Sequence, residues 1–206
     1  YGYEGRARAL QDVSLTIPKG SVVALVGLSG CGKSTTASLL MRFCDAAAGH
    51  IYMDGKDYHS MKPEELRKHI AMVPQQVNLF SGTIRENLLL ADPDADDQTL
   101  MEAVKEAGLL KFVQSLEKGL NSDVGNAGAS LSGGQRQKIG IARALLSKAE
   151  YMIFDEATSS VDPESEKEIW ETIGHLENGH YNPSLKLAMD IAHVFGCTVE
   201  DIFFFE

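Results

Sequence analysis

A glycine-rich segment constrains the fold of this chain more than any other feature of its sequence. Residues 27–35 read GLSGCGKST and fit the pattern G-x-x-x-x-G-K-[ST]. The motif follows an apolar run at residues 21–26, typical of a strand buried on both faces, and leads into residues 33–43, which we expect to be helical. In this context the glycines let backbone N–H groups and the helix N-terminus face an anion. The sequence therefore predicts a phosphate-binding loop in an α/β fold; the alternative is a chance match in a glycine-containing turn.

The side chains of this loop suit specific parts of a bound nucleotide. Lys33 can reach the β- and γ-phosphates, and the Ser34 hydroxyl can bind Mg²⁺. Cys31 is expected to bind the nucleotide with the rest of the loop. The alternative is that it only fills space and that its thiol has no role. The expected nucleotide-binding residues of the loop are Gly27, Ser29, Gly30, Cys31, Gly32, Lys33, Ser34 and Thr35.

Two acidic residues follow a second apolar run, at residues 151–154. A carboxylate at the C-terminal end of a parallel strand faces the ligand crevice of an open α/β sheet. Asp155 is therefore expected to serve Mg²⁺, directly or through its hydration shell, and Glu156 to polarise an attacking water. The alternative is an ordinary solvated loop.

A second glycine-containing helix start lies at residues 131–135, which read LSGGQ. Ser132 is a good N-cap for a helix over residues 132–146, and Gly133 and Gly134 leave backbone N–H groups accessible to an anion. One nucleotide does not need two such sites in one chain, so this one is expected to serve the nucleotide of another copy. Simple helix capping is the alternative.

The remaining pattern alternates short apolar runs with amphipathic segments, which implies a layered α/β fold. We expect strands at residues 12–17, 21–26, 49–53, 70–73 and 151–154. We expect helices at residues 33–43, 63–69, 83–90, 97–107, 109–116, 132–146, 163–176, 183–194 and 199–203.

Composition excludes several classes of protein. The 206 residues include 19 Lys and Arg against 29 Asp and Glu, and the net charge of −10 disfavours a protein that works mainly by gripping nucleic acid. Cys31, Cys44 and Cys197 form no disulfide framework or zinc spacing, as expected in a reducing compartment. No apolar run approaches the ~18 residues of a membrane span. The first residue is Tyr1, so the chain looks like a segment of something longer.

Together these motifs resemble the nucleotide-binding domain of an ATP-binding cassette (ABC) transporter of the exporter type, over residues 1–168. The phosphate loop, the 131–135 signature and the IFDEATSSVD segment at residues 153–162 occur in the family's order. Residues 73–75 resemble the family's Q-loop, and residues 79–87 read LFSGTIREN, a stretch typical of exporters.

The resemblance implies a fold and an activity. The fold is a P-loop NTPase with a parallel sheet core, an N-terminal antiparallel β part and a helical subdomain that carries the signature. The activity is ATP hydrolysis with Mg²⁺ in a head-to-tail dimer of two such domains, coupled to the transmembrane domains of an exporter at the cytoplasmic face of the membrane.

The resemblance also implies residue roles. Glu156, Gln75 and Lys33 would be catalytic, and Ser34, Gln75 and Asp155 would hold the metal. Tyr3 would stack on adenine, or is an ordinary exposed tyrosine. Ser132, Gly133, Gly134, Gln135 and Asp162 would act in trans on the partner's nucleotide.

The sequence departs from the family at two places. Asn126 stands where the family usually has Glu, in a segment expected to face the membrane domain. After about residue 168 the family's helix, strand and histidine segment do not follow, although Ile191-Ala192-His193 is an echo of it. His193 is either the γ-phosphate histidine or a histidine on a helix. The strand that is missing would lie between those at residues 21–26 and 151–154, so either these two pair directly or the tail fills the gap.

Residues 170–206 instead resemble the C-terminal half of a helix-turn-helix regulator. They carry one Lys, no Arg and six acids, opposite in sign to a DNA reader, so DNA is not an expected partner. We therefore divide the chain into an ATP-binding domain at residues 1–168 and an all-helical tail at residues 169–206. Two alternatives stay open: a truncated or fused domain that binds ATP with little turnover, and an ATP-linked DNA-binding regulator.

Overall fold

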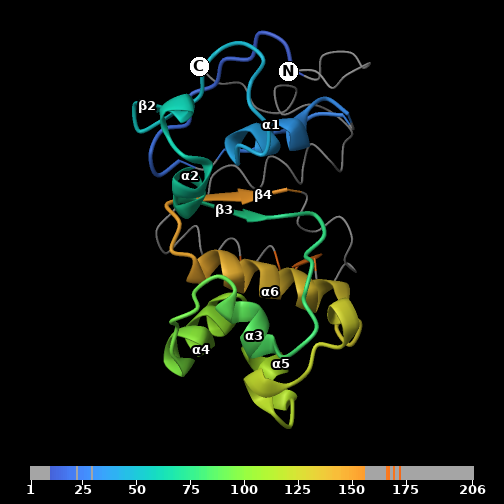
Figure 1. The fold of residues 1–206 in the computed structure, drawn as a ribbon. Coiled ribbons are helices and arrows are strands. Elements are labelled where there is room, and N and C mark those ends of the chain that lie inside the picture. The colour runs from blue at the N-terminus through green and yellow to red at the C-terminus, as the bar shows by residue number, and fades with distance from the viewer. Residues whose placement is uncertain are drawn as a thin grey trace. The chain divides into compact units, whose positions relative to one another are not determined.

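The computed structural model describes residues 10–155, except 22 and 29, together with residues 166, 167, 169 and 172. The described residues belong to two compact units, one up to Ser60 and the other from Met61 onward (Figure 1). The expected helices at residues 183–194 and 199–203, and hence the all-helical tail, lie outside the described residues. The four described residues after 155 are helical, in agreement with the helix expected at 163–176.

The first unit contains one helix and one hairpin. These are α1 (Lys33–Leu40), β1 (Tyr52–Met53), β2 (Lys56–Asp57) and the 3₁₀-helix η1 (Tyr58–Ser60). β1 and β2 are antiparallel and join through Asp54 and Gly55, whose φ angles of 49° and 78° are both left-handed. A two-residue turn of this kind favours Asp-Gly, because Gly tolerates positive φ and Asp tolerates it better than most residues. The hairpin supplies the antiparallel β part that the sequence predicts.

Two strand predictions in the first unit are wrong. Residues 12–17 and 21–26 run without strand structure at every position that the structure describes. Val13, Leu15 and Val23 are exposed rather than buried. An extended segment becomes a strand only when another segment satisfies its backbone N–H and C=O groups. Within the part of the chain that is described, β1–β2 and β3–β4 are the sheets, and these two segments belong to neither.

α1 also ends earlier than predicted, at Leu40 rather than at residue 43. Arg42 adopts a left-handed φ of 50°, which a continuing helix cannot accommodate. Its guanidinium donates to the Tyr58 carbonyl oxygen at 2.6 Å and pairs with Asp45 at 3.0 Å. These contacts with η1 and the following loop turn the chain away from the helix axis.

The second unit places a parallel strand pair against a set of helices. Its elements are α2 (Pro63–His69), β3 (Ile70–Val73), α3 (Ile84–Leu89), α4 (Asp97–Glu106), α5 (Leu110–Ser115), the 3₁₀-helices η2 (Gly119–Asn121) and η3 (Asn126–Gly128), α6 (Gly133–Leu146) and β4 (Tyr151–Phe154). β3 and β4 pair in parallel from Ile70 opposite Tyr151 to Val73 opposite Phe154. This pair is part of the parallel core that the sequence predicts, and both strands begin and end where their apolar runs do.

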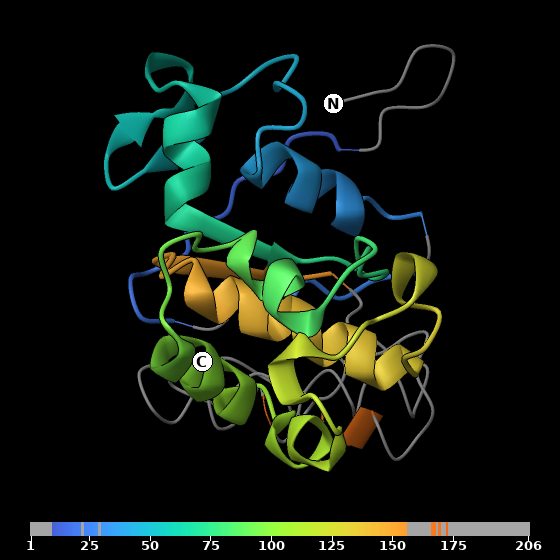
Figure 2. The same ribbon diagram turned by 60° about the horizontal axis from the view of Figure 1, so that its bottom comes forward.

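α6 forms the centre of the second unit. It lies between the β3–β4 pair and the helices α3 and α4 (Figures 1 and 2). Ile139, Ile141 and Ala142 are fully buried, which is unusual on successive faces of one helix and follows from contacts on both sides. Each large apolar side chain buried in this way contributes about 1.5–3 kcal/mol.

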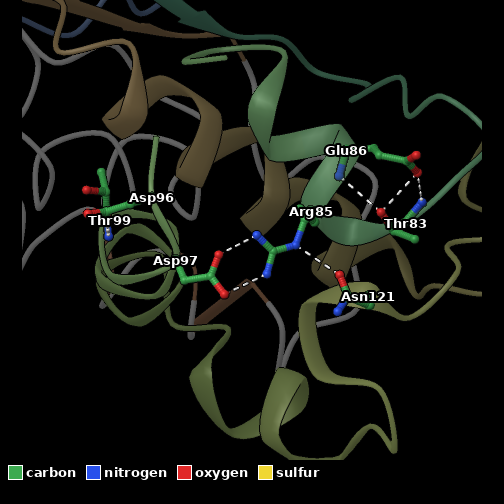
Figure 3. Close-up of polar contacts among 7 residues, drawn as sticks. All are labelled: Thr83, Arg85, Glu86, Asp96, Asp97, Thr99 and Asn121. Atoms are coloured by element: carbon green, nitrogen blue, oxygen red, sulfur yellow. Dashed lines mark hydrogen bonds and ion pairs between the residues drawn. The ribbon is translucent and has the colours of Figure 1, made fainter. Parts of the chain in front are cut away.

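Polar contacts fix the starts of α3 and α4 (Figure 3). Thr83 and Glu86 form a reciprocal capping box, and the Asp96 carboxylate accepts a hydrogen bond from the Thr99 N–H at 2.8 Å. The Arg85 guanidinium donates to both Asp97 carboxylate oxygens, at 2.5 and 2.9 Å, and to Asn121 at 2.9 Å. α3, α4 and η2 are therefore joined by polar contacts between their side chains.

The end of the described chain packs on the second unit. Ile169 is fully buried, and the Thr172 hydroxyl lies 2.8 Å from where a Cβ on Gly108 would be. In the described residues no helix is long and apolar enough to cross a membrane.

Candidate nucleotide site

The phosphate loop leads into the N-terminus of α1. Gly30 and Gly32 have left-handed φ angles of 84° and 105°, which residues with a Cβ rarely adopt. Gly32 is the N-cap of α1, and among the described residues no side chain caps this helix and no acid lies in its first turn. The helix N-terminus is thus not neutralised by its own first turn, as an anion-binding helix start requires.

Side chains within this loop differ in exposure. The Lys33 ammonium donates to the carbonyl oxygens of Gly27 at 2.9 Å and Leu28 at 3.3 Å, so it lies against the loop itself. Ser34 and Cys31 are exposed, whereas Thr35 is buried. A Cβ on Gly27 would come within 2.7 Å of the Cys31 Sγ, so a side chain at this position would require the Cys31 thiol to move.

Gln75 and Asp155 follow the carboxyl ends of two adjacent parallel strands. Val73 ends β3 opposite Phe154, the last residue of β4, and the Asp155 N–H donates to the Val73 carbonyl oxygen at 3.0 Å. Gln75, two residues beyond β3, is exposed. The structure therefore brings these two expected Mg²⁺ ligands to the same edge of the strand pair, where ligands of α/β sheets bind.

The donor set fits a magnesium ion chemically. A hydroxyl, an amide oxygen and a carboxylate are the hard oxygen ligands that Mg²⁺ takes beside phosphate oxygens and water. Ser34 belongs to the first unit, and Gln75 and Asp155 belong to the second. In the described residues no group of three or more His, Cys, Asp or Glu side chains could hold a metal.

The signature segment begins α6 with a closed capping box. The Ser132 hydroxyl accepts from the Gln135 N–H at 3.2 Å, and the Gln135 side-chain oxygen accepts from the Ser132 N–H at 2.9 Å. Helix capping, the alternative reading of these residues, is thus present. It occupies both side chains within their own helix turn, while Ser132 stays exposed and Gly134 is buried.

The segment before the signature is tied to the segment after Gln75. The Val124 N–H donates to the Gly82 carbonyl oxygen at 2.8 Å, and the Ile84 N–H donates to the Ser122 carbonyl oxygen at 3.0 Å. Asn126, the residue that departs from the family, accepts a hydrogen bond from the Ser81 hydroxyl at 3.3 Å. This amide therefore contributes to holding the two segments together.

Five expected site residues lie outside the described residues: Tyr3, Ser29, Glu156, Asp162 and His193. Sequence reasoning, in turn, missed three residues of α6 that contact the loop around Gln75. These are Gln137, Gly140 and Arg143. A glutamine and a glycine on the apolar face of a helix were the available signals.

This chain is similar to known proteins over most of its length. Residues 10–159 match the ABC transporter family. The chain is 45% identical to an ATP-dependent lipid A-core flippase of Haemophilus ducreyi over 94% of its own length and 32% of the flippase. It is 47% identical to the ABC multidrug transporter atrD of Emericella nidulans over 82% of its length and 13% of that transporter. The chain thus spans a third or less of these relatives.

The flippase match extends past residue 168, because residues 1–168 alone make up only about four fifths of the chain. Among solved structures, a bacterial Atm1-family ABC exporter with ATP bound has a TM-score of 0.81 and 36% identity to this chain. The match covers 88% of this chain and 32% of the exporter. The chain belongs to the ABC transporter family, and the part that it spans is the ATP-binding, ATPase domain of the exporter type.

Proposed function

We propose that this domain binds ATP with Mg²⁺ at residues 27–35 and hydrolyses it within a head-to-tail dimer. In this arrangement each nucleotide lies between one phosphate loop and residues 132–135 of a second nucleotide-binding domain. Closure on ATP and release after hydrolysis would move the transmembrane domains of an exporter, with this domain at the cytoplasmic face of the membrane. Closure of this kind converts ligand contacts into domain motion.

One observation carries the proposal: Gln75 and Asp155 follow adjacent parallel strands at one edge of the β3–β4 pair. A carboxylate and an amide at that edge can hold Mg²⁺ and orient a water. The bound ion would supply charge neutralisation between the β- and γ-phosphates. Glu156, directly after Asp155, would take a proton from the attacking water, and Lys33 would bind the phosphate oxygens.

The remaining roles follow the same scheme. Ser34 would bind Mg²⁺ through its hydroxyl, and Tyr3 would stack on the adenine. Ser132, Gly133, Gly134, Gln135 and Asp162 would complete the partner's site. The start of α6 supports this, because exposed Ser132 begins a helix of 14 residues whose N-terminal dipole favours an anion.

The substitution Glu156→Gln tests the hydrolytic step. An amide cannot accept the proton of the attacking water, so we expect phosphate release to stop while ATP binding and ATP-dependent dimers persist. Glu150→Gln is a matched control, because Glu150 precedes β4 as Glu156 follows it. Phosphate release and light scattering with ATP measure both effects. Normal phosphate release by Glu156→Gln contradicts the role of this residue.

A second function is favoured by the exposure of the segment before the phosphate loop. Val23, Leu25 and Val26 are each about 40% exposed and unpaired in the described structure. A phosphate loop without a buried strand behind it can still bind ATP but is poorly placed for turnover. This second candidate is therefore an ATP-binding domain with little hydrolysis. ATP affinity and phosphate release measured on one preparation separate the two functions, since tight binding without release supports the second.

A further inference from the structure

Three residues on one face of α6 contact the loop that carries Gln75. Gln137, Gly140 and Arg143 are spaced three apart, so they lie along one side of the helix. They face, in order, Pro74, Val77 and Asn78. The contacts therefore follow the loop on both sides of Gln75.

Gln137 holds the loop on the side nearer β3. Its side-chain amide donates to the Pro74 carbonyl oxygen at 3.0 Å, directly before Gln75. Gln137 is only 3% exposed. A buried amide costs free energy unless it is hydrogen-bonded, so this contact fixes both the side chain and the loop.

Gly140 lets the loop approach the helix closely. A Cβ at this position would lie 2.5 Å from the Val77 Cγ2 atom, closer than packed side chains ever come. Glycine inside a helix is destabilising compared with alanine. Its presence here is explained by the closeness of Val77.

Arg143 holds the far side of the loop. Its guanidinium donates to the Asn78 carbonyl oxygen at 2.8 Å, and to the carbonyl and side-chain oxygens of Asn87 at 2.7 and 2.6 Å. Asn87 is 1% exposed and also bonds the backbone of Phe80 and Thr83. Burial lowers the pKa of Arg143, so these acceptors compensate a partly desolvated cation.

Other contacts also support the loop, because Asn87 bonds both the N–H and the C=O group of Phe80. A pocket of about 340 Å³ lies beside these contacts and is lined by Met72, Val77 and Ala144 among others. The α6 contacts at Pro74, Val77 and Asn78 lie along the wall of this pocket.

We propose that Gln137, Gly140 and Arg143 are positioning residues that fix Gln75 relative to the signature at the start of the same helix. α6 would thus join the loop that serves this chain's nucleotide to Ser132, which serves the partner's. A shift of one signature would be transmitted to the Gln75 of the same chain as a rigid-body movement. This inference rests on the function proposed above for Gln75 and Ser132.

The first test replaces Gln137 with Met, which keeps the length of the side chain and removes the donor. We expect faster amide hydrogen exchange at residues 75–79 and a kcat lower by roughly 10- to 100-fold, with KM for ATP unchanged. Gln98→Met is the matched control, because Gln98 is an exposed glutamine on α4. It should change neither quantity.

The second test uses the contact of Gly140 with Val77. Gly140→Ala should raise exchange at residues 75–79 and lower kcat, although alanine favours the helix. Adding Val77→Ala removes the clashing methyl groups and should restore both. A merely structural role of Gly140 in the helix would not be rescued from the loop.

The outcomes separate this inference from the proposed function. Unchanged loop exchange in both Gln137→Met and Gly140→Ala overturns the inference, as does raised exchange with unchanged kcat. Absence of phosphate release by the unsubstituted chain contradicts the hydrolytic function instead. In that case the exchange measurements still decide whether α6 holds the loop.

Discussion

Two apolar runs of similar composition differ in structure, because one forms a paired strand and the other does not. Residues 70–73 form β3, pair with β4 along their whole length, and bury Val73 completely. Residues 21–26 are a longer apolar run, yet Val23 is 38% exposed and the run forms no strand in the described structure. An apolar pattern therefore supplies the side chains of a strand, whereas a neighbouring segment must supply its backbone hydrogen bonds.

The two helix starts that would bind phosphate in the proposed function also differ, in how their N-termini are capped. α6 begins with a reciprocal capping box from Ser132 and Gln135. α1 begins at Gly32, without a side-chain cap among the described residues.

The substitution with the largest expected effect tests whether the first unit binds the nucleotide, although the segment before its phosphate loop is exposed. Lys33→Met removes the cation of the phosphate loop, and we expect kcat to fall on the order of 10²–10³-fold, because the developing phosphate charge loses a preorganised donor. Lys19→Met, at the exposed turn before the loop, is the control. Phosphate release and ATP binding measure the effect. Full activity of Lys33→Met would place the site elsewhere.

A matched pair of truncations tests whether the two apolar runs differ in burial. Val73→Ala should lower the free energy of unfolding by ~1–3 kcal/mol, because it leaves a cavity beside β4. Val23→Ala should change it by less than ~0.5 kcal/mol, as expected of an exposed site. Urea unfolding measures both. Equal losses would mean that residues 21–26 are buried in solution.

Ser132→Ala tests whether the capping box at the start of α6 stabilises the protein. This change removes one half of the capping box and should cost about 1 kcal/mol in urea unfolding. Ser132→Thr keeps the hydroxyl and should retain most of the stability. If Ser132→Ala unfolds like the unsubstituted chain, the cap contributes nothing and the start of α6 is as open as that of α1.

The smallest expected effect is a loss of folding stability at low pH. A hydrogen bond from the Thr99 N–H lowers the pKa of Asp96, and one from the His59 N–H lowers the pKa of Asp57, so each unit has such a carboxylate. Since each folded-state pKa is depressed, its stabilisation is present above the ordinary aspartate pKa of ~3.9 and is lost as the pH falls through the lowered value.

Asp96→Asn keeps a side-chain acceptor but cannot titrate. We expect this variant to lose less stability than the unsubstituted chain when urea unfolding is compared at pH 7 and pH 3. A pH dependence that Asp96→Asn leaves unaltered would show that the Asp96 cap does not contribute.

Local signals predicted the second unit well. Pro63 at the first turn, Ser132 at a helix start and the runs at residues 70–73 and 151–154 mark α2, α6, β3 and β4. The placement of Gln75 and Asp155 at one edge, in contrast, follows from the parallel pairing of β3 with β4, which the structure supplies. The roles of Glu156, Asp162 and Tyr3 stay predictions.

Other features could not be predicted from local pattern. The close approach of Val77 to Gly140 and the bonds from Gln137 and Arg143 join segments about 60 residues apart. No periodicity reports such a contact, because each side chain is compatible with an ordinary helix position.

By itself the sequence determined the motifs, the order of elements in the second unit and the family, since these depend on residue type and on spacing along the chain. Only the tertiary structure decided which apolar runs pair, which polar side chains are buried, and that α6 holds the loop around Gln75. Those properties depend on distant segments satisfying each other's hydrogen bonds and filling each other's space, and that information is absent from any local stretch of residues.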